Sequence, residues 1–351
     1  MADVPEALID FQRRRSGEFY PKADIAIADE HLRELVVSSP RVTRSTAIEA
    51  LASVGIAAES VESLGTPGTF HELFSFVNPS DRGRHVIKLN RVPEWGPDAA
   101  LVMESTLVVT LPENVRRLDI GMADITRGSV PTDFQLMRFS PAPSLRSFDD
   151  DEHRAISAIA PWAEQLRYLH EVEAEGFGLA AVEPGGAVIS GAAPSWAAYL
   201  NTRRDEHLDR IAAAGLVTGA EKAAAAVALD KLVDQAPDST GRILHGDCGP
   251  HNAVDDPAGV ALIDWEDALV GDPLFEVAMW ATFAPERRWE AFFTAYFGSS
   301  WMPTELFWMY FLRISLAKTV VRLRFGYEDK PGRPPASQRI QRALAGLDAA
   351  E

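Results

Sequence analysis

Cysteine is almost absent from this sequence: Cys248 is the only one in 351 residues. A single cysteine excludes an intrachain disulfide and is compatible with a reducing compartment. Long hydrophobic runs are also missing. The most apolar late stretch, residues 306–323, is interrupted by three basic residues and is expected to form a buried amphipathic helix. The first residues lack the basic region and apolar core of a signal peptide, so we expect a cytoplasmic protein with no membrane segment.

Basic residues are scarce relative to acidic ones. The chain has 34 Lys and Arg against 51 Asp and Glu, which gives a net charge of −17. This excess of acid repels phosphate backbones and anionic membrane surfaces, so nucleic acid is not an expected partner. The negative charge of the chain would attract a cationic substrate, although many proteins are equally acidic for solubility alone. A hydrophobic fraction of 46% over this length is sufficient for two lobes with a substantial core.

The most informative stretch of the sequence begins at His245 and contains Asp247 and Asn252. A short strand-like run precedes it, and a second apolar run follows the turn at residues 255–259 and ends at Asp264. Two strand-like pieces around a turn predict a hairpin that brings both carboxylates and the amide to one end. Phosphoryl transfer from a nucleotide requires this set. One Asp orients and deprotonates the attacking hydroxyl, while an Asn and another Asp hold Mg²⁺ against the phosphates.

Four residues separate Asp247 from Asn252, as in the kinase catalytic loop, and Asp264 stands in the place of the metal-binding Asp. Here His-Gly-Asp replaces His-Arg-Asp, and Trp-Glu follows Asp264 instead of Phe-Gly. This variant resembles the aminoglycoside phosphotransferase family, which shares the protein-kinase-like fold and includes antibiotic, choline and sugar kinases. The Gly-Asp-Pro at residues 271–273 matches the family's segment before its next helix. The alternative is a structural hairpin with three surface polar residues.

Two further segments resemble hygromycin-type phosphotransferases in particular. They are the Leu-His at residues 169–170 followed by Gly-Phe-Gly at residues 176–178, and the Ser-Trp at residues 195–196. We interpret His170 as a structural residue at a helix end. The resemblance implies ATP and Mg²⁺ as cofactors, with GTP left open as the donor.

The expected roles follow from the motif and the resemblance together. Asp247 is the expected catalytic base, and Asn252 and Asp264 are the expected Mg²⁺ ligands. His245 is expected to support the loop through hydrogen bonds. The acids at residues 272 and 276 are expected to support the loop or cap a helix rather than take part in the chemistry.

Lys88 lies inside the apolar strand expected at residues 84–90. Burying an ammonium group is costly unless it is paired. We therefore interpret Lys88 as the lysine that binds the nucleotide phosphates and pairs with a helical Glu. Glu104 is the only acid within the apolar body of the helix expected at residues 97–111, and Glu94 is its rival. The alternative is a lysine at a strand edge with its tip in solvent.

A turn is expected before the strand at residues 72–77. Gly65, Gly68 and Thr69 lie in this turn, where kinases cover the nucleotide phosphates with backbone N–H groups. An ordinary hairpin is an equally good explanation of the glycines taken alone.

A further strand is expected at residues 134–139, followed by the proline-rich residues 140–143. Stiff chain after a strand suits a hinge between lobes. In the kinase-like fold, hinge backbone groups bind the adenine edge, so Arg138, Phe139 and Ser140 are candidate nucleotide-binding residues. A simple surface loop is the alternative.

The expected fold is α/β (α+β) and two-lobed, protein-kinase-like, with a small β-rich N-lobe and a larger helical C-lobe. We expect an N-terminal extension over residues 1–40, an N-lobe with the hinge over 41–146, and a catalytic C-lobe over 147–351. Residues 25–37 are expected to be helical. The basic run at residues 11–15 is expected to be solvated. Aromatic residues in the helices after the motif are expected to pack in the core.

The predicted function is transfer of the ATP γ-phosphate to a hydroxyl of a polyhydroxylated small molecule, such as an aminoglycoside or an amino sugar. The absence of an Ala-Pro-Glu segment after Asp264 disfavours a protein kinase. Acid at Glu266, Asp267 and residues 149–152 favours a cationic acceptor, bound between the catalytic hairpin and the helices after Gly178. The run at 149–152 is also expected to cap a helix. A housekeeping sugar or amino-alcohol kinase, and a nucleotide-binding pseudokinase, remain alternatives, and the oligomeric state is left open.

Overall fold

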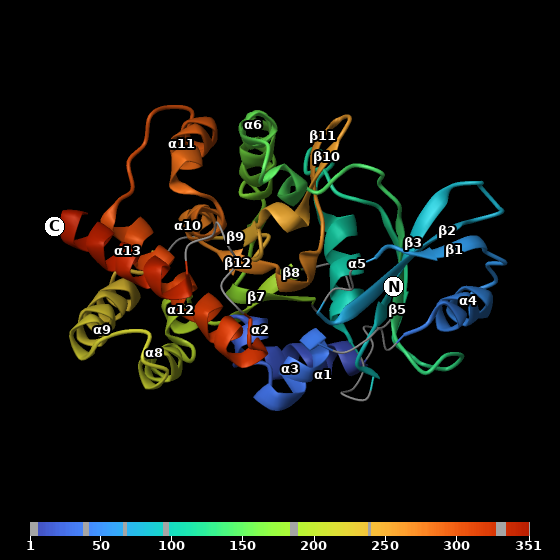
Figure 1. The fold of residues 1–351 in the computed structure, drawn as a ribbon, viewed down its shortest axis with the longest axis horizontal. Coiled ribbons are helices and arrows are strands. Elements are labelled where there is room, and N and C mark those ends of the chain that lie inside the picture. Colours follow the sequence, from blue (N-terminus) through green and yellow to red (C-terminus); the bar gives the residue numbers. More distant parts are fainter. Residues whose placement is uncertain are drawn as a thin grey trace.

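The computed structural model describes residues 6–37, 42–65, 69–93, 98–182, 189–237, 240–327 and 335–350. These residues form two lobes. A β-sheet with one covering helix makes the smaller lobe, and the helices of the second half of the chain make the larger lobe (Figure 1). The two-lobed α/β fold expected from the sequence is therefore present. The described residues contain no helix that is both long enough and apolar enough to cross a membrane.

The N-lobe is built on an antiparallel five-stranded sheet in the order β1-β2-β3-β5-β4. Its strands are β1 (Glu59–Ser63), β2 (His71–Val77), β3 (Arg84–Asn90), β4 (Ile120–Asp124) and β5 (Phe134–Arg138). Helix α4 (Arg44–Ser53) packs against β1 and contributes to the small core of this lobe. The strands expected around residues 72–77, 84–90 and 134–139 are confirmed.

The alternation of side chains along β3 decides where its lysine points. Ile87 and Leu89 are fully buried in the same core as α4. Because successive residues of a strand face opposite sides, Lys88 points to the other face. Helix α5 (Ala100–Thr110) lies on that side, and its apolar residues belong to the core of the large lobe. Lys88 therefore points toward the junction of the two lobes.

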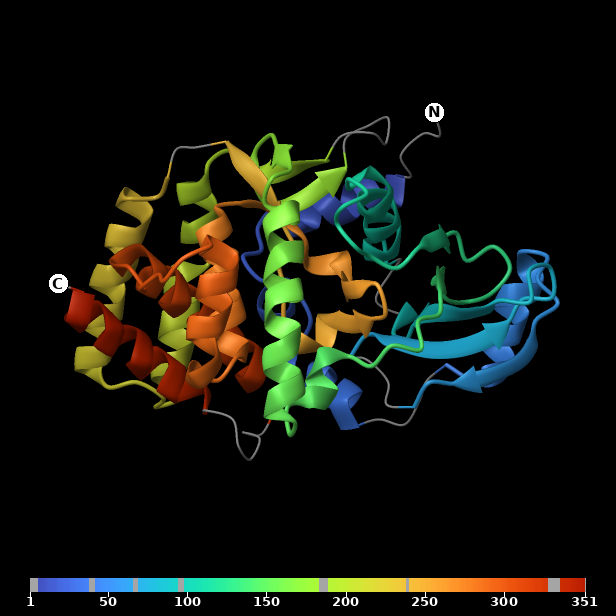
Figure 2. The ribbon, with the colours of Figure 1, turned by 90° about the horizontal axis from the view of Figure 1, so that it is seen from above.

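The C-lobe contains a second five-stranded sheet and most of the helices (Figure 2). Its strands, in the order β6-β9-β12-β7-β8, are β6 (Glu173–Ala174), β9 (Gly241–Leu244), β12 (Leu269–Gly271), β7 (Phe177–Val182) and β8 (Ile189–Ala193). Its helices are α6 (Glu152–Leu169), α7 (Trp196–Asn201), α8 (Arg204–Ala213), α9 (Gly219–Asp234), α10 (Pro273–Phe283), α11 (Trp289–Phe297), α12 (Glu305–Phe325) and α13 (Ala336–Ala350).

Side-chain caps define where several of these helices begin. The acid run before α6 supplies its cap, because the Asp151 side chain accepts from Arg154 N. Thr218 and Glu221 form a capping box at α9. Asp272 caps α10. The helix-capping roles expected for Asp272 and for the run at 149–152 are thus confirmed.

Aromatic side chains fill the C-lobe core, as expected. Trp280 stacks on Phe292 with ring centroids 3.8 Å apart, and Trp289 contacts Phe293, Phe307 and Trp308. The ladder of aromatic contacts joins α10, α11 and α12. These residues therefore stabilise the lobe that holds the catalytic hairpin.

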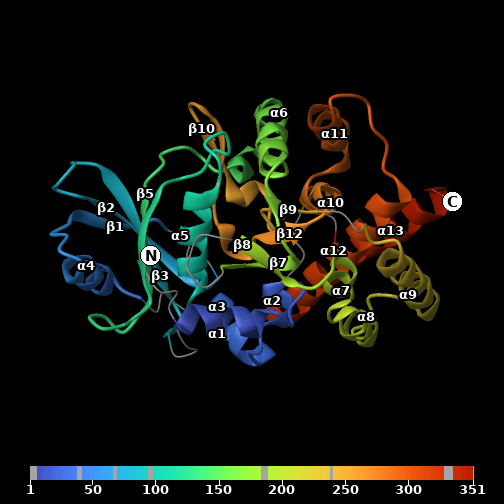
Figure 3. The same ribbon diagram turned by 180° about the vertical axis from the view of Figure 1, so that it is seen from behind.

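Residues 6–37 are not a separate extension. Helices α1 (Glu6–Arg15), α2 (Pro21–Asp24) and α3 (Asp29–Val37) lie together at the junction of the lobes and pack against α5 and α12 (Figure 3). The expected helix at 25–37 begins only at Asp29, because residues 25–28 form a turn. The interpretation of residues 11–15 as solvated is wrong for Arg15, which is 6% exposed. The boundaries expected at residues 40 and 146 stay predictions.

Candidate active site

The loop that carries Asp247 is held by a buried carboxylate. Both Glu276 oxygens accept backbone hydrogen bonds, from His245 N at 2.8 Å and from Gly246 N at 2.8 Å. His170 Nε2 lies 2.9 Å from the same carboxylate. Gly246 has φ +81°, and a Cβ there would lie 1.7 Å from the carbonyl oxygen of Asp267, so only glycine fits. Glu276 and His170 therefore have the supporting roles expected for them.

His245 connects the catalytic loop to the hairpin that follows it. Its Nε2 lies 2.9 Å from the carbonyl oxygen of Ile263, and its ring packs against Trp265. The hairpin consists of β10 (Ala253–Asp256) and β11 (Gly259–Leu262), which are antiparallel. Ile263 N donates to Asn252 O at 3.0 Å and closes its open end. A hairpin is present around the expected turn, but its first strand is β10 and not the run before His245, which pairs with β12 and β6 in the C-lobe sheet.

Asp247 lies at the centre of a polar cluster and is 4% exposed. Asn252 Nδ2 donates to Asp247 Oδ2 at 3.2 Å and to Asp247 O at 3.0 Å. His251 Nε2 lies 3.3 Å from the same Oδ2. Burial opposes ionisation of Asp247, but the nearby Lys22 and His251 outweigh it and hold the pKa of this carboxyl well below its ordinary value. The carboxylate is therefore ionised at neutral pH.

Asp264 follows the hairpin in a left-handed backbone conformation with φ +64°. This conformation is uncommon for a residue with a side chain, and such strain concentrates at functional sites. It turns the carboxylate toward β3, where Asp264 Oδ1 lies 2.8 Å from Lys88 Nζ. Burial raises the pKa of Asp264. The nearby Lys88 and Lys22 lower this pKa by more than burial raises it, so the pKa lies below its ordinary value.

Lys88 and Glu104 form the ion pair that the sequence predicts. Lys88 Nζ lies 3.2 Å from Glu104 Oε2, and both side chains are almost fully buried. The other oxygen of Glu104 accepts from Trp265 N at 3.0 Å. Glu104 thus links the N-lobe lysine to the segment directly after Asp264. The rival Glu94 lies outside the described residues.

Two side-chain oxygens in this cluster are suited to a divalent cation. Within the described residues, Asp264 Oδ2 and Asn252 Oδ1 accept no hydrogen bond. Carboxylate and amide oxygens are hard ligands of the kind that Mg²⁺ prefers. The described residues contain no group of three or more His, Cys, Asp and Glu that could hold a metal ion. Mg²⁺ in phosphoryl-transfer sites binds through one or two carboxylates and the substrate phosphates, so the donor set fits.

The expected phosphate turn lies between β1 and β2. Gly65 has φ +97°, and its N–H donates to Ser63 Oγ at 3.2 Å. Thr69 Oγ1 lies 3.1 Å from Tyr327 Oη, so this hydroxyl contacts the end of the C-lobe. Gly68 lies outside the described residues. The phosphate-binding role of the turn stays a prediction.

The expected hinge residues follow β5. Arg138 N donates to Asp119 O at 2.9 Å, and Phe139 N donates to Arg84 O at 3.2 Å. Ser140 Oγ accepts from Ala142 N. Two of the expected hinge N–H groups are therefore engaged within the N-lobe, and contact of this segment with a purine stays a prediction.

The structure adds two residues that sequence reasoning missed. Tyr20 Oη donates to Asp247 Oδ1 at 3.1 Å, and Lys22 Nζ lies 3.5 Å from Asp247 Oδ2. Both come from the short α2 segment, about 225 residues before the loop that they contact. The only local signal is the Tyr-Pro-Lys sequence, which predicts a helix start and no chemistry. The sequence alone therefore could not place them.

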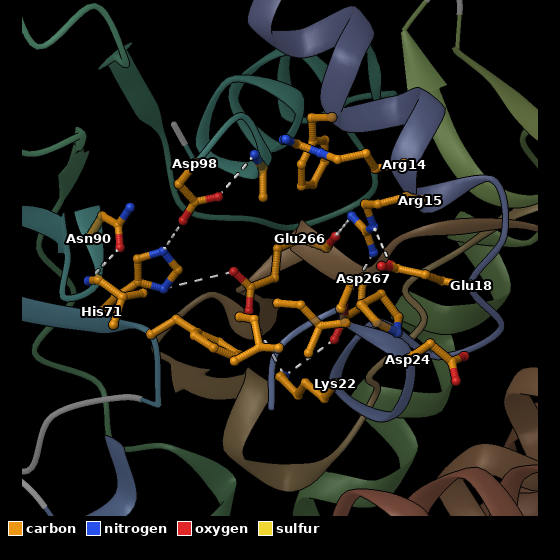
Figure 4. A pocket seen from close by; sticks show the side chains of 18 of the residues that line it. Arg14, Arg15, Glu18, Lys22, Asp24, His71, Asn90, Asp98, Glu266 and Asp267 are labelled. Carbon is orange, nitrogen blue, oxygen red and sulfur yellow. Dashed lines mark hydrogen bonds and ion pairs between the residues drawn. The ribbon is translucent and has the colours of Figure 1, made fainter. Parts of the chain in front are cut away.

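A cavity of about 450 Å³ opens beside this cluster. One wall comes from α1 and α2, and the opposite wall comes from the start of β2 and of α5. Figure 4 shows Glu266 pointing into it, with His71 between Glu266 and Asp98, and Lys22 beside Asp267. The lysines nearest to Glu266 lie 3.7 and 3.9 Å away, whereas Asp267 lies 3.2 Å from Lys22.

The acceptor pocket that we expected between the catalytic hairpin and the helices after Gly178 stays a prediction. Beside α7, the ring of Phe19 packs against Tyr199 and Phe275. Two of the acids expected to attract a cation are paired within the chain. Glu152 binds Arg287 and Arg288, and Asp267 lies near Arg15 and Lys22. Glu266 lines the cavity and points into it.

Comparisons with known proteins agree with this architecture. The model of the phosphotransferase enzyme family matches residues 110–305, more than half of the chain. No curated protein sequence matches the chain. Among solved structures, a thermostable mutant of aminoglycoside phosphotransferase APH(4)-Ia, in ternary complex with AMP-PNP and hygromycin B, is similar with a TM-score of 0.62 and 18% identity. The match covers 86% of this chain and 97% of that one.

Two further structures share the fold. Macrolide 2′-phosphotransferase MphH from Brachybacterium faecium has a TM-score of 0.55 and 18% identity, over 88% of this chain and 98% of that chain. A choline/ethanolamine kinase family protein from Mesorhizobium loti has a TM-score of 0.54 and 18% identity, over 87% and 93%. At these identities the likeness concerns the fold, and the acceptors named for these proteins belong to them.

Proposed function

Because the chain belongs to the phosphotransferase enzyme family, we propose that it transfers the γ-phosphate of ATP to a hydroxyl of a small molecule. One observation carries the proposal. An ionised buried Asp247 lies against Asn252, and Asp264 lies against the buried Lys88–Glu104 pair at the junction of the lobes. Phosphoryl transfer needs a base, metal ligands and a phosphate-binding cation in this arrangement.

Each group has a distinct task in the proposed reaction. Asp247 accepts the proton of the acceptor hydroxyl as that oxygen bonds to the γ-phosphorus, and ADP leaves with the electrons of the broken bond. Lys88 binds the nucleotide phosphates. Asn252 and Asp264 would hold Mg²⁺, which neutralises charge on the phosphates when bound. Glu104 keeps Lys88 charged and directed at the cleft.

Cys248 has no part in this reaction. Its side chain is 1% exposed, and its sulfur lies 3.5 Å from the carbonyl oxygen of Glu276. Burial raises the pKa of the thiol well above its ordinary value, which disfavours the thiolate needed for nucleophilic attack. Direct transfer between hydroxyl and phosphate needs no covalent enzyme intermediate.

We propose a polyhydroxylated acceptor that carries an amine. The cavity beside Lys22 is large enough for a ring-sized group, and Glu266, whose nearest lysines lie 3.7 and 3.9 Å away, points into it. The hygromycin B bound to the similar phosphotransferase is consistent with this class. The competing acceptor class is a neutral sugar. It is supported by the ion pairs that Asp267 and Glu152 already form with cations of the chain itself, because paired acids attract an amine less.

A panel of acceptors assayed by nucleotide turnover tests the proposal. We expect ATP consumption that depends on Mg²⁺ and on one acceptor class, and the same assay with GTP identifies the donor. Paired amino and deaminated acceptors decide the acceptor class, because a preference for the deaminated partner contradicts the amine requirement. If the protein binds nucleotide but turns over ATP neither with any acceptor of the panel nor with water, the result contradicts the proposed enzymatic activity and favours a pseudokinase.

A further inference from the structure

The segment that contains α2 has a conformation fixed by a buried polar network. Asp24 Oδ2 accepts from Phe19 N at 2.8 Å and from Tyr20 N at 3.0 Å, which closes a tight turn. Asp24 Oδ1 lies 2.7 Å from His207 Nε2, and His207 Nδ1 lies 3.1 Å from Arg313 Nη1. Every member of this network is less than 9% exposed. The turn therefore belongs to the interior of the C-lobe.

A second set of contacts ties the same segment to α12 and α7. Tyr199 Oη donates to Phe19 O at 2.5 Å. The guanidinium of Arg324 donates to the backbone carbonyls of Ala23, Ile25 and Ile27. Buried backbone carbonyls satisfied in this way are costly to expose. The segment therefore stays in place as one wall of the proposed catalytic centre and does not have to move away before the reaction.

This segment places the ammonium group of Lys22 beside Asp247, the proposed base. Lys22 Nζ lies 3.2 Å from Asp267 Oδ2, 3.5 Å from Asp247 Oδ2 and 3.9 Å from Glu266 Oε1. Burial opposes the charge of Lys22, but the carboxylates of Asp267 and Asp247 raise its pKa well above the ordinary value. Lys22 therefore lies beside the proposed base and the acid that points into the cavity.

The proposed chemistry needs a cation at this position. In phosphoryl transfer, negative charge spreads over the three oxygens of the transferring group, and a positioned cation stabilises it. The four residues between Asp247 and Asn252 are Cys-Gly-Pro-His and include no lysine or arginine. Lys88 is bound to Glu104 and Asp264 on the nucleotide side. No other described ammonium or guanidinium forms an ion pair with Asp247.

We propose that Lys22 is a catalytic residue, whose ammonium group contacts the transferring phosphoryl group during the reaction. This role rests on the proposed function. As the acceptor oxygen bonds to the γ-phosphorus, the bond to the β–γ bridging oxygen breaks, ADP leaves with that electron pair, and Asp247 takes the hydroxyl proton. Lys22 keeps its proton throughout and neutralises the charge on the oxygens of the transferring group.

The test compares Lys22→Met with Lys22→Arg, using ATP turnover with the acceptor found in the panel or with water. Lys22→Met is expected to lower kcat on the order of 10²–10³-fold, the usual effect of removing one preorganised transition-state donor. Its Kd for AMP-PNP should not change, because nucleotide affinity depends on Lys88. Lys22→Arg should restore a substantial part of kcat, since it returns the charge.

Two controls separate this role from a structural one. Lys222→Met removes an exposed lysine paired with Asp209 on α8 and should leave kcat unchanged. Asp24→Asn loosens the anchored turn, so it should increase proteolysis within residues 6–27. Lys22→Met should keep the wild-type cleavage pattern while it loses kcat.

Several outcomes would overturn the inference. If Lys22→Met retains the wild-type kcat, Lys22 does not stabilise the transition state. A higher kcat for Lys22→Met would show that Lys22 restrains the site instead. A loss of kcat accompanied by the Asp24→Asn cleavage pattern, with no rescue by arginine, would make the effect structural. If the wild type shows no turnover with any acceptor or with water, the proposed function itself fails, and the role of Lys22 fails with it.

Discussion

The catalytic hairpin and the α2 segment contact the same carboxylate but are organised in opposite ways. The hairpin is held by close neighbours in sequence, such as the bond from Ile263 N to Asn252 O and the contact of His245 with Ile263 O. The α2 segment depends on His207, Arg313 and Arg324, which lie about 180–300 residues away along the chain.

The difference separates two kinds of functional residue. Local order leaves a pattern that can be read in the chain, because turns and strand pairing fix the spacing of Asp247, Asn252 and Asp264. Contacts between residues remote in sequence leave no such pattern, because no residue near Lys22 in the sequence sets the distance from Lys22 to Asp247. Five predictions test this contrast, from the largest expected effect to the smallest.

Replacing the base should abolish the chemistry of the hairpin without disturbing its structure. Asp247→Ala is expected to lower kcat on the order of 10²–10⁴-fold, the usual contribution of positioned general-base catalysis. AMP-PNP binding measured by calorimetry should survive, because Asp247 acts on the acceptor. Asp256→Ala, at the far end of β10, is the matched control and should retain kcat. Wild-type turnover by Asp247→Ala would remove this residue from the role of base.

Removing the buried partner of Lys88 should destabilise the junction of the lobes. Glu104→Ala leaves Lys88 with one fewer carboxylate and Trp265 N without an acceptor. Breaking a buried pair from one side costs about 3–5 kcal/mol of unfolding free energy. Urea unfolding measures the loss, and the KM for nucleotide should rise. The exposed Glu113→Ala is the control on the same part of the chain, and equal stability of the two variants would contradict the prediction.

The α2 side should respond to pH through Glu18. Burial raises the pKa of Glu18 from 4.5 to about 7, although Arg15 acts against the shift. Between these two values the folded state holds a proton that the unfolded state has released, so stability falls as pH rises from about 4.5 to about 7. The loss is at most about 3 kcal/mol.

Glu18→Gln removes this titration. The free energy of unfolding of Glu18→Gln, measured relative to the wild type by denaturant titration, should therefore increase across the same pH window. A difference between the two proteins that does not change with pH would show that Glu18 has an ordinary pKa.

One hydrogen bond between α7 and the α2 segment should have a modest effect. Tyr199→Phe keeps the ring contact with Phe19 and removes the donor to Phe19 O. The expected loss is about 1 kcal/mol of unfolding free energy. Hydrogen exchange should show faster opening of residues 19–24 while the hairpin is unchanged. Equal acceleration in both regions would mean that the two are one cooperative unit.

The smallest effect is expected at the exposed end of the basic run. Arg13 is 74% exposed at its side chain and pairs with Asp10 one turn away, whereas the neighbouring Arg15 is buried. Arg13→Ala should change stability by less than about 0.5 kcal/mol. Thermal unfolding measures this, and Arg15→Ala provides the contrasting loss.

Much of the proposed catalytic centre could be predicted from the sequence. The positions of Asp247, Asn252 and Asp264 follow from one motif, and the Lys88–Glu104 pair follows from a lysine in a strand before an apolar helix with one acid. The expectation for Arg15 failed because burial of an arginine depends on Asp267 and on the carbonyl of Glu266, which are remote in sequence.

The sequence by itself determined the family, the two-lobed fold and the order of the groups along the catalytic loop. These properties depend on spacing and on the alternation of apolar residues, which are local. Only the tertiary structure decided that Tyr20 and Lys22 contact Asp247, that Glu266 faces the cavity, and that residues 6–37 belong to the junction of the lobes. Such contacts join segments hundreds of residues apart, and burial in a shared core sets their distances.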